Sequence, residues 1–209
     1  MTYVKASVRR PAGNPGNGIQ PKDQLVIYDV DDILSFPQRN EAGVVIEDDI
    51  VMKEGRYAIG IYLTPGTAEI SSNSDGETDA EGYTPSIKFN HPGNQQEIRE
   101  FKTNWLTKKC IVVLRYCSGK PADLIGTPCN PCKLSVSYTG SNESNTNELT
   151  FTQISKGDDI AIYQGTDTLE EPVAVVEAKA TDITYQTDGQ YQLSAGEAKI
   201  AGVTGGSHG

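Results

Sequence analysis

The cysteine pair in "TPCNPCKL" has the spacing most suggestive of chemistry in this chain. Cys129 and Cys132 form a C-x-x-C motif. In redox proteins such a motif opens a helix after a strand, because the helix N-terminus lowers the pKa of the first thiol. Here the two prolines of the motif favour a turn, and the alternating stretch 133–139 that follows favours a strand. The sequence therefore predicts a bend that leads into a strand, in preference to a redox site.

A structural zinc site is the second chemistry that cysteines can supply, and it requires four ligands. Cys110 and Cys117 are the other thiols of the chain. They stand at the two ends of "CIVVLRYC", which is apolar on both faces and is predicted to form a buried central strand. Their odd separation would direct them to opposite faces of that strand. Structural thiols are therefore favoured over zinc ligands.

The chain has two histidines, which limits histidine-dependent catalysis. His91 precedes a proline, and His208 lies in a glycine-rich tail. With so little imidazole, a Ser-His-Asp or Cys-His arrangement is not favoured. The glycine-rich phosphate-binding motifs of nucleotide enzymes are not found either. We therefore expect no catalytic residues, no cofactor and no bound metal, and we expect the protein not to be an enzyme, with an unrecognised hydrolase as a minor alternative.

Four acids alternate within the polar stretch 71–85, at Asp75, Glu77, Asp79 and Glu81. In an extended chain they would share one face and could bind calcium. The stretch lacks the glycine spacing of a known calcium loop, so a solvated acidic loop is favoured.

Composition narrows the class further. The chain has 209 residues, 36% of them hydrophobic, and a net charge of −10. This length fits one large all-β domain or two small ones. With 18 basic and 28 acidic residues, tight binding to nucleic acid is not expected, because it requires cations that neutralise phosphates. No apolar run resembles a signal peptide or a membrane helix, so we expect a cytoplasmic protein with reduced thiols and no membrane partner.

The charge is unevenly distributed. Residues 139–209 carry 11 acids and 3 bases, whereas residues 1–22 carry only bases. A basic N-terminal arm and an acidic C-terminal third could pair across subunits, or they could be two solvated faces.

Alternating apolar and polar residues predict many short strands. One amphipathic helix is expected over 94–109, with Asn94 as its N-cap and with Ile98, Phe101 and Trp105 on its buried face. Asp188-Gly189 predicts a hairpin over 182–194. The other expected strands are 3–9, 24–30, 56–63, 110–117, 133–139, 148–154 and 159–165. The expected loops are 11–21, 71–85 and 139–147.

We therefore predict a mainly β fold, with a β-sandwich or barrel-like sheet, one packed α-helix and room for a small C-terminal β module. The expected divisions are a basic arm (1–22), a core β domain (23–140), and an acidic β extension with a flexible tail (141–209).

The order of these elements resembles that of a known family. The strands run from "YVKASVR" to "GEAKIAG", the helix "NQQEIREFKTNWLTKK" follows the long polar stretch "SSNSDGETDAEGYTP", and acids are in excess. In this the chain resembles the major tail tube proteins of long-tailed bacteriophages. The resemblance implies a structural virion protein, assembled in the host cytoplasm into homo-oligomeric, hexameric rings. The rings would stack into a tube beside other tail proteins and conduct DNA without binding it tightly.

The resemblance also implies inter-subunit contacts through the arm 1–22 and the stretch 71–85. The candidate contact residues are Lys5, Arg9, Arg10, Asp75, Glu77, Asp79 and Glu81. One alternative is another virion protein, for head decoration or head–tail joining. A second is a stand-alone β-sandwich that binds carbohydrate or a protein partner through exposed tyrosines. Its candidate residues are Tyr62, Tyr83, Tyr138, Tyr163 and Tyr191.

Overall fold

The computed structural model describes residues 6–13, 16–117, 119–169, 183–185 and 191–193. These residues are mainly β, with a large sheet and a single α-helix, which confirms the predicted fold class. Contacts divide the chain into two units, Met1–Glu170 and Glu171–Gly209. In the second unit, β13 (Ile183–Tyr185) pairs antiparallel with β14 (Tyr191–Leu193), both within the predicted hairpin, whose Asp188-Gly189 turn lies outside the described residues.

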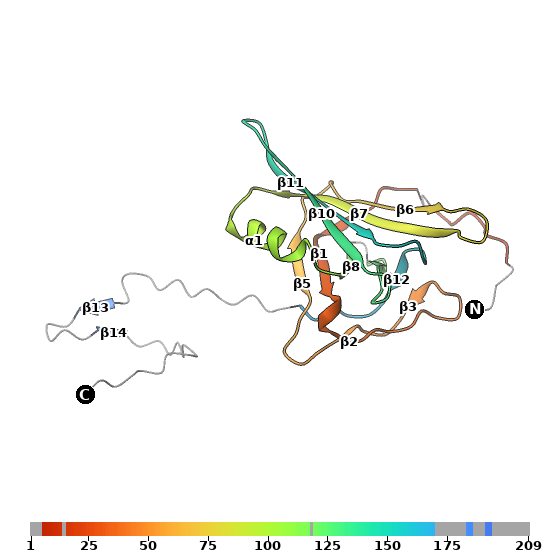
Figure 1. Cartoon of the computed structure of the whole chain (residues 1–209), viewed down its shortest axis with the longest axis horizontal. Helices are drawn as coiled ribbons and strands as arrows, with labels where there is room; N and C mark the ends of the chain where they lie inside the picture. The colour runs from red at the N-terminus through yellow and green to blue at the C-terminus, as the bar shows by residue number, and fades with distance from the viewer. Residues whose placement is uncertain (1–5, 14–15, 118, 170–182, 186–190, 194–209) are drawn as a thin grey trace. The chain divides into compact units, whose positions relative to one another are not determined.

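Ten strands of the first unit form one continuous sheet that folds into two layers, joined where β8 meets β10 (Figure 1). We call the first the central layer. Its strands, in spatial order, are β5 (Ile59–Tyr62), β1 (Pro21–Asp29), β8 (Cys110–Tyr116), β9 (Ala122–Ile125), β12 (Ala161–Tyr163) and β3 (Val45–Ile46). All its neighbours are antiparallel except β12 and β3, which are parallel.

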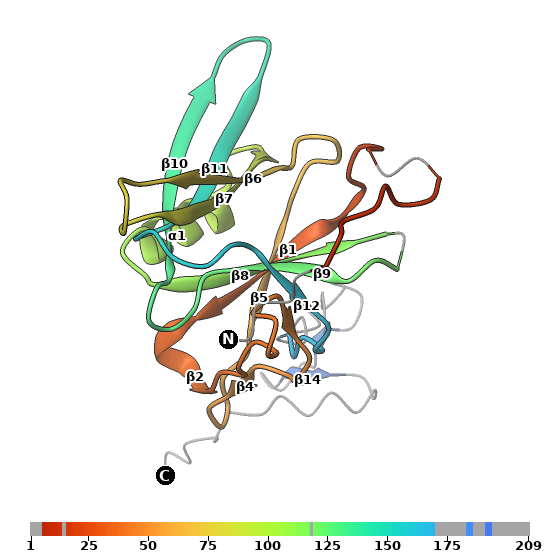
Figure 2. The same cartoon turned by 90° about the vertical axis from the view of Figure 1, so that its right-hand side faces the viewer.

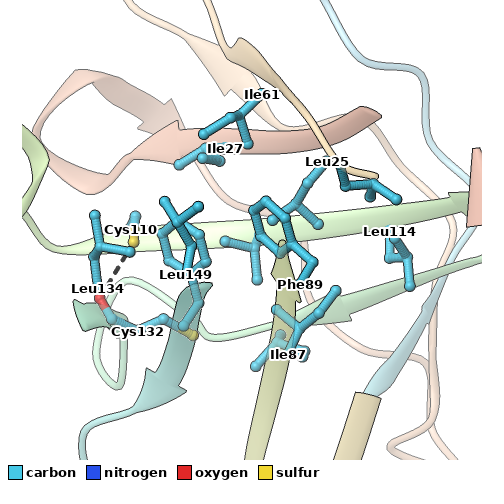
Figure 3. Close-up of a cluster of buried hydrophobic side chains, with 14 of the residues drawn as sticks. Leu25, Ile27, Ile61, Ile87, Phe89, Cys110, Leu114, Cys132, Leu134 and Leu149 are labelled. Carbon is cyan, nitrogen blue, oxygen red and sulfur yellow. Dashed lines mark hydrogen bonds between the residues drawn. The ribbon is translucent and has the colours of Figure 1, made fainter. Parts of the chain in front are cut away.

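The outer layer is an antiparallel sheet. It consists of β10 (Cys132–Gly140), β11 (Asn145–Gln153), β7 (Gly82–Pro92) and β6 (Glu69–Asp75), in that order. One register pair, Cys110 with Cys132, connects it to the central layer. Figure 3 shows that β7 of the outer layer crosses β8 of the central layer.

The first core lies between the two layers (Figure 3). Strand alternation supplies it: Leu25 and Ile27 come from β1, and their register partners Leu114 and Val112 come from β8. The outer layer contributes further buried side chains. These are Ile87, Phe89, Leu134, Leu149 and Phe151.

A second core covers the opposite face of the central layer. Val26 and Tyr28 of β1 belong to it, as does Val113 of β8. The segment between β1 and β5 packs against this face and contributes Ile46 and Ile50. That segment contains a short 3₁₀ helix, η1 (Val30–Asp32), and a small two-stranded sheet of β2 (Ile33–Ser35) and β4 (Val51–Met52). The prediction that 110–117 is a strand covered on both faces is therefore confirmed over β8.

The helix α1 (Gln96–Trp105) lies within the predicted range and packs on the first core. Ile98 is buried, and Phe101 stacks on Trp105 with ring centroids 5.7 Å apart. The predicted N-cap is wrong: Gln95 takes that position without a side-chain cap hydrogen bond. The Asn94 side chain is engaged elsewhere, since its Oδ1 accepts a hydrogen bond from the Lys102 ammonium at 3.1 Å.

The predicted loop 71–85 is wrong. Its first part continues β6 and its last part begins β7, and only the turn between Asp75 and Gly82 is irregular. The polar composition hid the strands because Ser and Asn do not produce an apolar alternation on β6. Likewise, the expected loop 139–147 is mostly hairpin, because β10 and β11 pair up to Gly140 and Asn145.

Two expected boundaries can be compared with the fold. The expected division between residues 140 and 141 falls at the tip of the β10–β11 hairpin, and the first unit continues to Glu170. At the N-terminus, the strand expected over 3–9 is not formed over residues 6–9, and its first three residues lie outside the described part. No other described strand pairs with these residues, which leaves their backbone without a sheet partner.

Candidate assembly surface

The outer layer has one buried face and one polar face. Inward residues of β10 and β11 alternate with outward residues such as Ser135 and its register partner Thr150. On the β7 side, Lys88 stands opposite Thr150 and Glu69. Glu69 and Lys88 form an ion pair at 3.2 Å, and this hydrogen bond raises the pKa of Lys88. The outward face is therefore a sheet surface of hydroxyl and charged groups.

Strand β6 forms the edge of the outer layer. It pairs along seven residues with β7 on one side, and no described strand pairs with its other side. The border strands of the central layer are shorter, since β3 has two residues and β5 has four. An edge strand presents a row of backbone N–H and C=O groups that can pair with another chain. Residues 69–75 are therefore an open edge of seven residues, and at the other border of this layer residues 133–140 of β10 also lack a second described strand, because β10 meets β8 only at Cys132.

The four candidate acids gather at the turn beyond this edge. Asp75 ends β6, and Glu77, Asp79 and Glu81 follow in the turn, all exposed. Gly76 has φ of +142°, and a side chain there would lie 2.3 Å from the Ala80 carbonyl oxygen. The chain reverses tightly, so the acids do not form the extended row that a shared face requires.

One of these acids already has a cation partner. The Lys156 ammonium lies 3.1 Å from the Asp75 carboxylate, and its hydrogen bond lowers the pKa of Asp75. The turn is also attached at Tyr83, whose backbone exchanges two hydrogen bonds with Gly157. Lys156 and Gly157 thus hold the base of the β6–β7 turn in place, while Glu77, Asp79 and Glu81 extend beyond them.

The basic arm is separate from this turn along the chain. Arg9 and Arg10 are exposed and lie outside any strand, while Lys5 is not among the described residues. The arm meets the sheet where the Cys117 backbone N–H donates to the Gln20 carbonyl at 2.9 Å. The structure therefore does not bring the basic and acidic candidates together through any ion pair that it describes.

The β10–β11 hairpin extends beyond its neighbouring strands (Figures 1 and 2). A polar cluster attaches its outer half, at the register pair of Tyr138 and Asn147, to the helix. The Lys102 ammonium donates to Asn147 Oδ1 at 2.6 Å and lies 5.1 Å from the Tyr138 ring centroid. Asn147 is fully buried and donates through Nδ2 to the Gly93 carbonyl at 2.5 Å. This cluster fixes the direction in which the polar hairpin leaves the core.

The central layer has a polar cluster of its own, which we call the Asp167 latch. The Asp167 carboxylate accepts from Tyr28 at 2.6 Å and forms an ion pair with Arg115. The Arg115 guanidinium also donates to the Gly165 carbonyl at 2.6 Å. Burial, followed by the bond to Asp167, raises the pKa of Tyr28. Both tyrosine and arginine stay protonated, so the latch is a structural attachment of residues 164–169.

Tyr116 and Asp123 are the pair of described residues that most resembles a catalytic acid and base. Tyr116 donates to the Asp123 carboxylate, and burial raises the pKa values of both groups. They line a cavity of about 530 Å³ together with residues 17–20 of the arm. A proton held between these groups satisfies two partly buried polar side chains, which explains the pair without a reaction.

The cysteine motif forms the predicted bend. Thr127 and Asn130 exchange backbone hydrogen bonds of 3.1 Å, and Cys132 begins β10. Cys129 is exposed and Cys132 is buried. Cys110 is buried as expected of a strand covered on both faces, whereas Cys117 is exposed because β8 ends at Tyr116, one residue before it. Among the described residues, no three His, Cys, Asp or Glu side chains are grouped as metal ligands.

The tyrosines proposed for a binding module differ in exposure. Tyr62, Tyr83 and Tyr138 are each more than 40% exposed, whereas Tyr163 is fully buried, and the side chain of Tyr191 is not described. Tyr62 meets the edge of His91, and Tyr138 lies under Lys102. Tyr163 instead donates towards Thr166 and accepts from the Ile50 backbone, so it belongs to the second core.

Sequence reasoning missed three parts of this surface: strand β6, strand β7 and the contact between Lys102 and Asn147. The edge strand β6 has no apolar periodicity that could have revealed it. Strand β7 did carry a signal, because Pro85, Ile87 and Phe89 are buried at alternate positions. The contact between Lys102 and Asn147 depends on tertiary structure, and no local pattern encodes it.

Comparisons with family models, with curated proteins and with solved structures found no match. Among the described residues, no helix is both long and apolar enough to span a membrane.

Proposed function

We propose that this chain is an architectural subunit that assembles with copies of itself through the edge of its outer layer. The observation that carries the proposal is β6, a seven-residue edge strand with no described strand paired on its outer side. Pairing an exposed edge with a second chain satisfies backbone groups that otherwise face water. A head-to-tail contact of this kind, between the β6 edge and a different surface of the next copy, produces a ring when its rotation closes.

The proposed assembly is a homo-oligomeric ring, hexameric by the family resemblance, whose copies stack into a virion tail tube that conducts DNA. Three further features support a role in contacts rather than in catalysis. The β10–β11 hairpin is polar and braced by Lys102, the arm with Arg9 and Arg10 is exposed, and the β6–β7 turn carries three acids beyond Asp75. The opposite charges of arm and turn favour contacts between different copies.

Charge also suits passage of DNA. A chain with net charge −10 repels phosphates and does not retain a moving strand. The other tail proteins would bind the ends of the tube, and the assembled protein would be located in the virion.

Sedimentation velocity and negative-stain electron microscopy test the proposal directly. The wild-type chain is expected to form rings or hollow rods as its concentration is increased. Introducing lysines on β6, in the double variant Asn73→Lys/Ser74→Lys, should leave a folded monomer, because charge on an edge strand opposes pairing. The matched control is Thr150→Lys/Thr152→Lys, which places the same charge on partly exposed positions of β11, a strand paired on both sides.

Two outcomes would contradict the proposal. A wild-type protein that stays monomeric at high concentration, with or without added tail components, would exclude self-assembly. Equal loss of assembly in both double variants would show that net charge, rather than the β6 edge, controls association. Specific retention of the monomer by a glycan array, lost in Tyr62→Ala or Tyr138→Ala, would instead favour the binding-module alternative.

A further inference from the structure

Two buried cysteines stand opposite each other where the central and outer layers join. Cys110 begins β8, Cys132 begins β10, and they are the register pair that links the two strands. Directly opposed residues of an antiparallel pair have Cα atoms about 4.5–5.5 Å apart and side chains on the same face. Disulfides usually span Cα separations of about 4.4–6.8 Å. The backbone therefore already has the spacing that a disulfide requires.

The surroundings of the two thiols leave room for them to meet. Both side chains are fully buried in the first core, where the Cys110 thiol donates to the Cys132 carbonyl oxygen at 3.4 Å (Figure 3). The Cys132 sulfur faces Gly126, where an added Cβ would lie only 3.1 Å from it. A glycine at that position gives the sulfur its space. Rotation about the two Cα–Cβ bonds would turn the sulfurs towards each other.

The remaining thiols are placed differently. Cys129 is exposed on the bend and lines a surface cavity with Phe36 and Arg39. Cys117 is exposed beyond the end of β8, where its thiol donates to the Pro21 carbonyl at 3.4 Å. Although Cys129 and Cys132 form the C-x-x-C motif, one faces solvent and the other faces the core. The tertiary structure therefore favours Cys110 as the partner of Cys132.

We propose that Cys110 and Cys132 are a latent disulfide that cross-links the central and outer layers on oxidation. With oxidised glutathione as the oxidant, the two thiols lose two protons and two electrons as their S–S bond forms. The glutathione S–S bond breaks and takes up those electrons and protons as two thiols. This inference concerns the single chain and does not depend on assembly.

The reduced pair is protected until the layers separate locally. Burial raises the pKa of the Cys110 thiol to about 12 and also raises that of Cys132, so little of the nucleophilic thiolate is present. Oxidation should therefore be slow in the folded protein and should proceed through opening or refolding. A chain made in a reducing cytoplasm would carry thiols and could close the cross-link after it leaves that compartment.

Refolding in glutathione buffers tests the proposal at equilibrium, where access is not limiting. The full-length variant Cys117→Ser/Cys129→Ser retains only the buried pair. It is refolded from urea over a series of ratios of reduced to oxidised glutathione. Acid and an alkylating agent then trap the free thiols, and mass spectrometry gives the fraction of chains that contain the disulfide. The same fraction is measured for the unfolded chain, kept in urea. We expect the folded chain to form the disulfide at least tenfold more favourably than the unfolded chain, with the thermal midpoint raised by roughly 5–10 °C.

The single-thiol variant Cys110→Ser/Cys117→Ser/Cys129→Ser is the control, and its midpoint should not rise in more oxidising buffers, because Cys132 then has no partner thiol in the chain and can form only a mixed disulfide with glutathione. Wild-type protein, refolded in the same buffers and mapped by peptide mass spectrometry, should contain the Cys110–Cys132 link. An equal or lower disulfide yield in the folded chain would overturn the proposal. A thermal midpoint lowered by oxidation would also overturn it, as would a predominant Cys129–Cys132 link in the wild type. The wild-type mapping alone is sufficient to test the proposal if the double variant does not fold.

Discussion

The central layer and the outer layer are built from the same kind of strand but are exposed to different surroundings. The central layer is covered on both faces, by the first core and by the second, and its strand β8 is apolar at five consecutive positions from Cys110 to Leu114. The outer layer is covered on one face, and its strands alternate between buried and exposed residues. One layer thus supplies stability, while the other supplies a polar face and an open edge.

This difference separates the residues that stabilise the fold from those of the proposed contact surface. Sequence changes on the outward face of the outer layer touch few neighbours, so that face can change without loss of the fold. Changes within the central layer disturb one of two cores. Substitutions matched between the layers can therefore test whether the division is as sharp as the packing indicates.

The largest effect is expected in the first core. Leu114 of the central layer is 1% exposed, and Leu114→Ala should lower the free energy of unfolding by about 4 kcal/mol through lost burial and a cavity. Urea denaturation followed by circular dichroism measures the change. Ser137→Ala, on the exposed part of β10, should shift it by no more than about 0.5 kcal/mol. Similar losses in both variants would contradict the division between the layers.

The Asp167 latch should produce the next largest effect. Asp167→Ala leaves Arg115 and Tyr28 without their shared acceptor. It should lower the free energy of unfolding by about 3 kcal/mol, because the mostly buried Arg115 guanidinium loses the carboxylate that balances its charge. Thr168→Ala is the control. The Thr168 side chain is exposed and its backbone carbonyl, which accepts from the Ala58 N–H, is retained. A latch variant as stable as its control would show that residues 164–169 are held by other contacts.

The brace of the hairpin sharpens the comparison within the outer layer. Lys102→Met removes the donor to the buried Asn147 and should cost about 1–2 kcal/mol, less than either change in the central layer. Hydrogen exchange should show faster exchange over residues 136–149 than in Lys109→Met, whose exposed side chain makes no described contact of this kind. Unchanged exchange would mean that β10 and β11 hold their direction without the helix.

Acidification should give the smallest effect, and it also acts on the outer layer. Burial lowers the folded-state pKa of His91 below its usual value of about 6.5. The folded state therefore favours the neutral ring. Its contribution is fully present above the unfolded-state pKa and is lost as the pH falls through that value towards the lower folded-state pKa.

Urea midpoints at pH 7.5 and pH 5.5 measure this effect. Wild-type protein should lose more stability between these values than His91→Gln, in which position 91 does not titrate. His208 is common to both proteins, so its titration cancels in the difference. An identical loss in the two proteins would remove His91 as a source of acid sensitivity.

The sequence was most informative where burial determines which residues are apolar. The continuous apolar run before Arg115 identified a strand covered on both faces, and the 3.6-residue spacing of Ile98, Phe101 and Trp105 identified the helix. It was least informative at β6, where Ser and Asn side chains are compatible with both a loop and an edge strand. The opposition of Cys110 and Cys132 could not be predicted, because it depends on the register between strands that are separated in the chain.

The Asp167 latch has a mechanical consequence. Leu169 forms a parallel bridge with Ala58, and Asp167 is bound to Arg115 in the middle of the central layer. Tension on the chain after residue 169 would therefore be transmitted into β8, a strand with neighbours on both sides, instead of peeling away a border strand. A load applied at that point is shared by many hydrogen bonds at once.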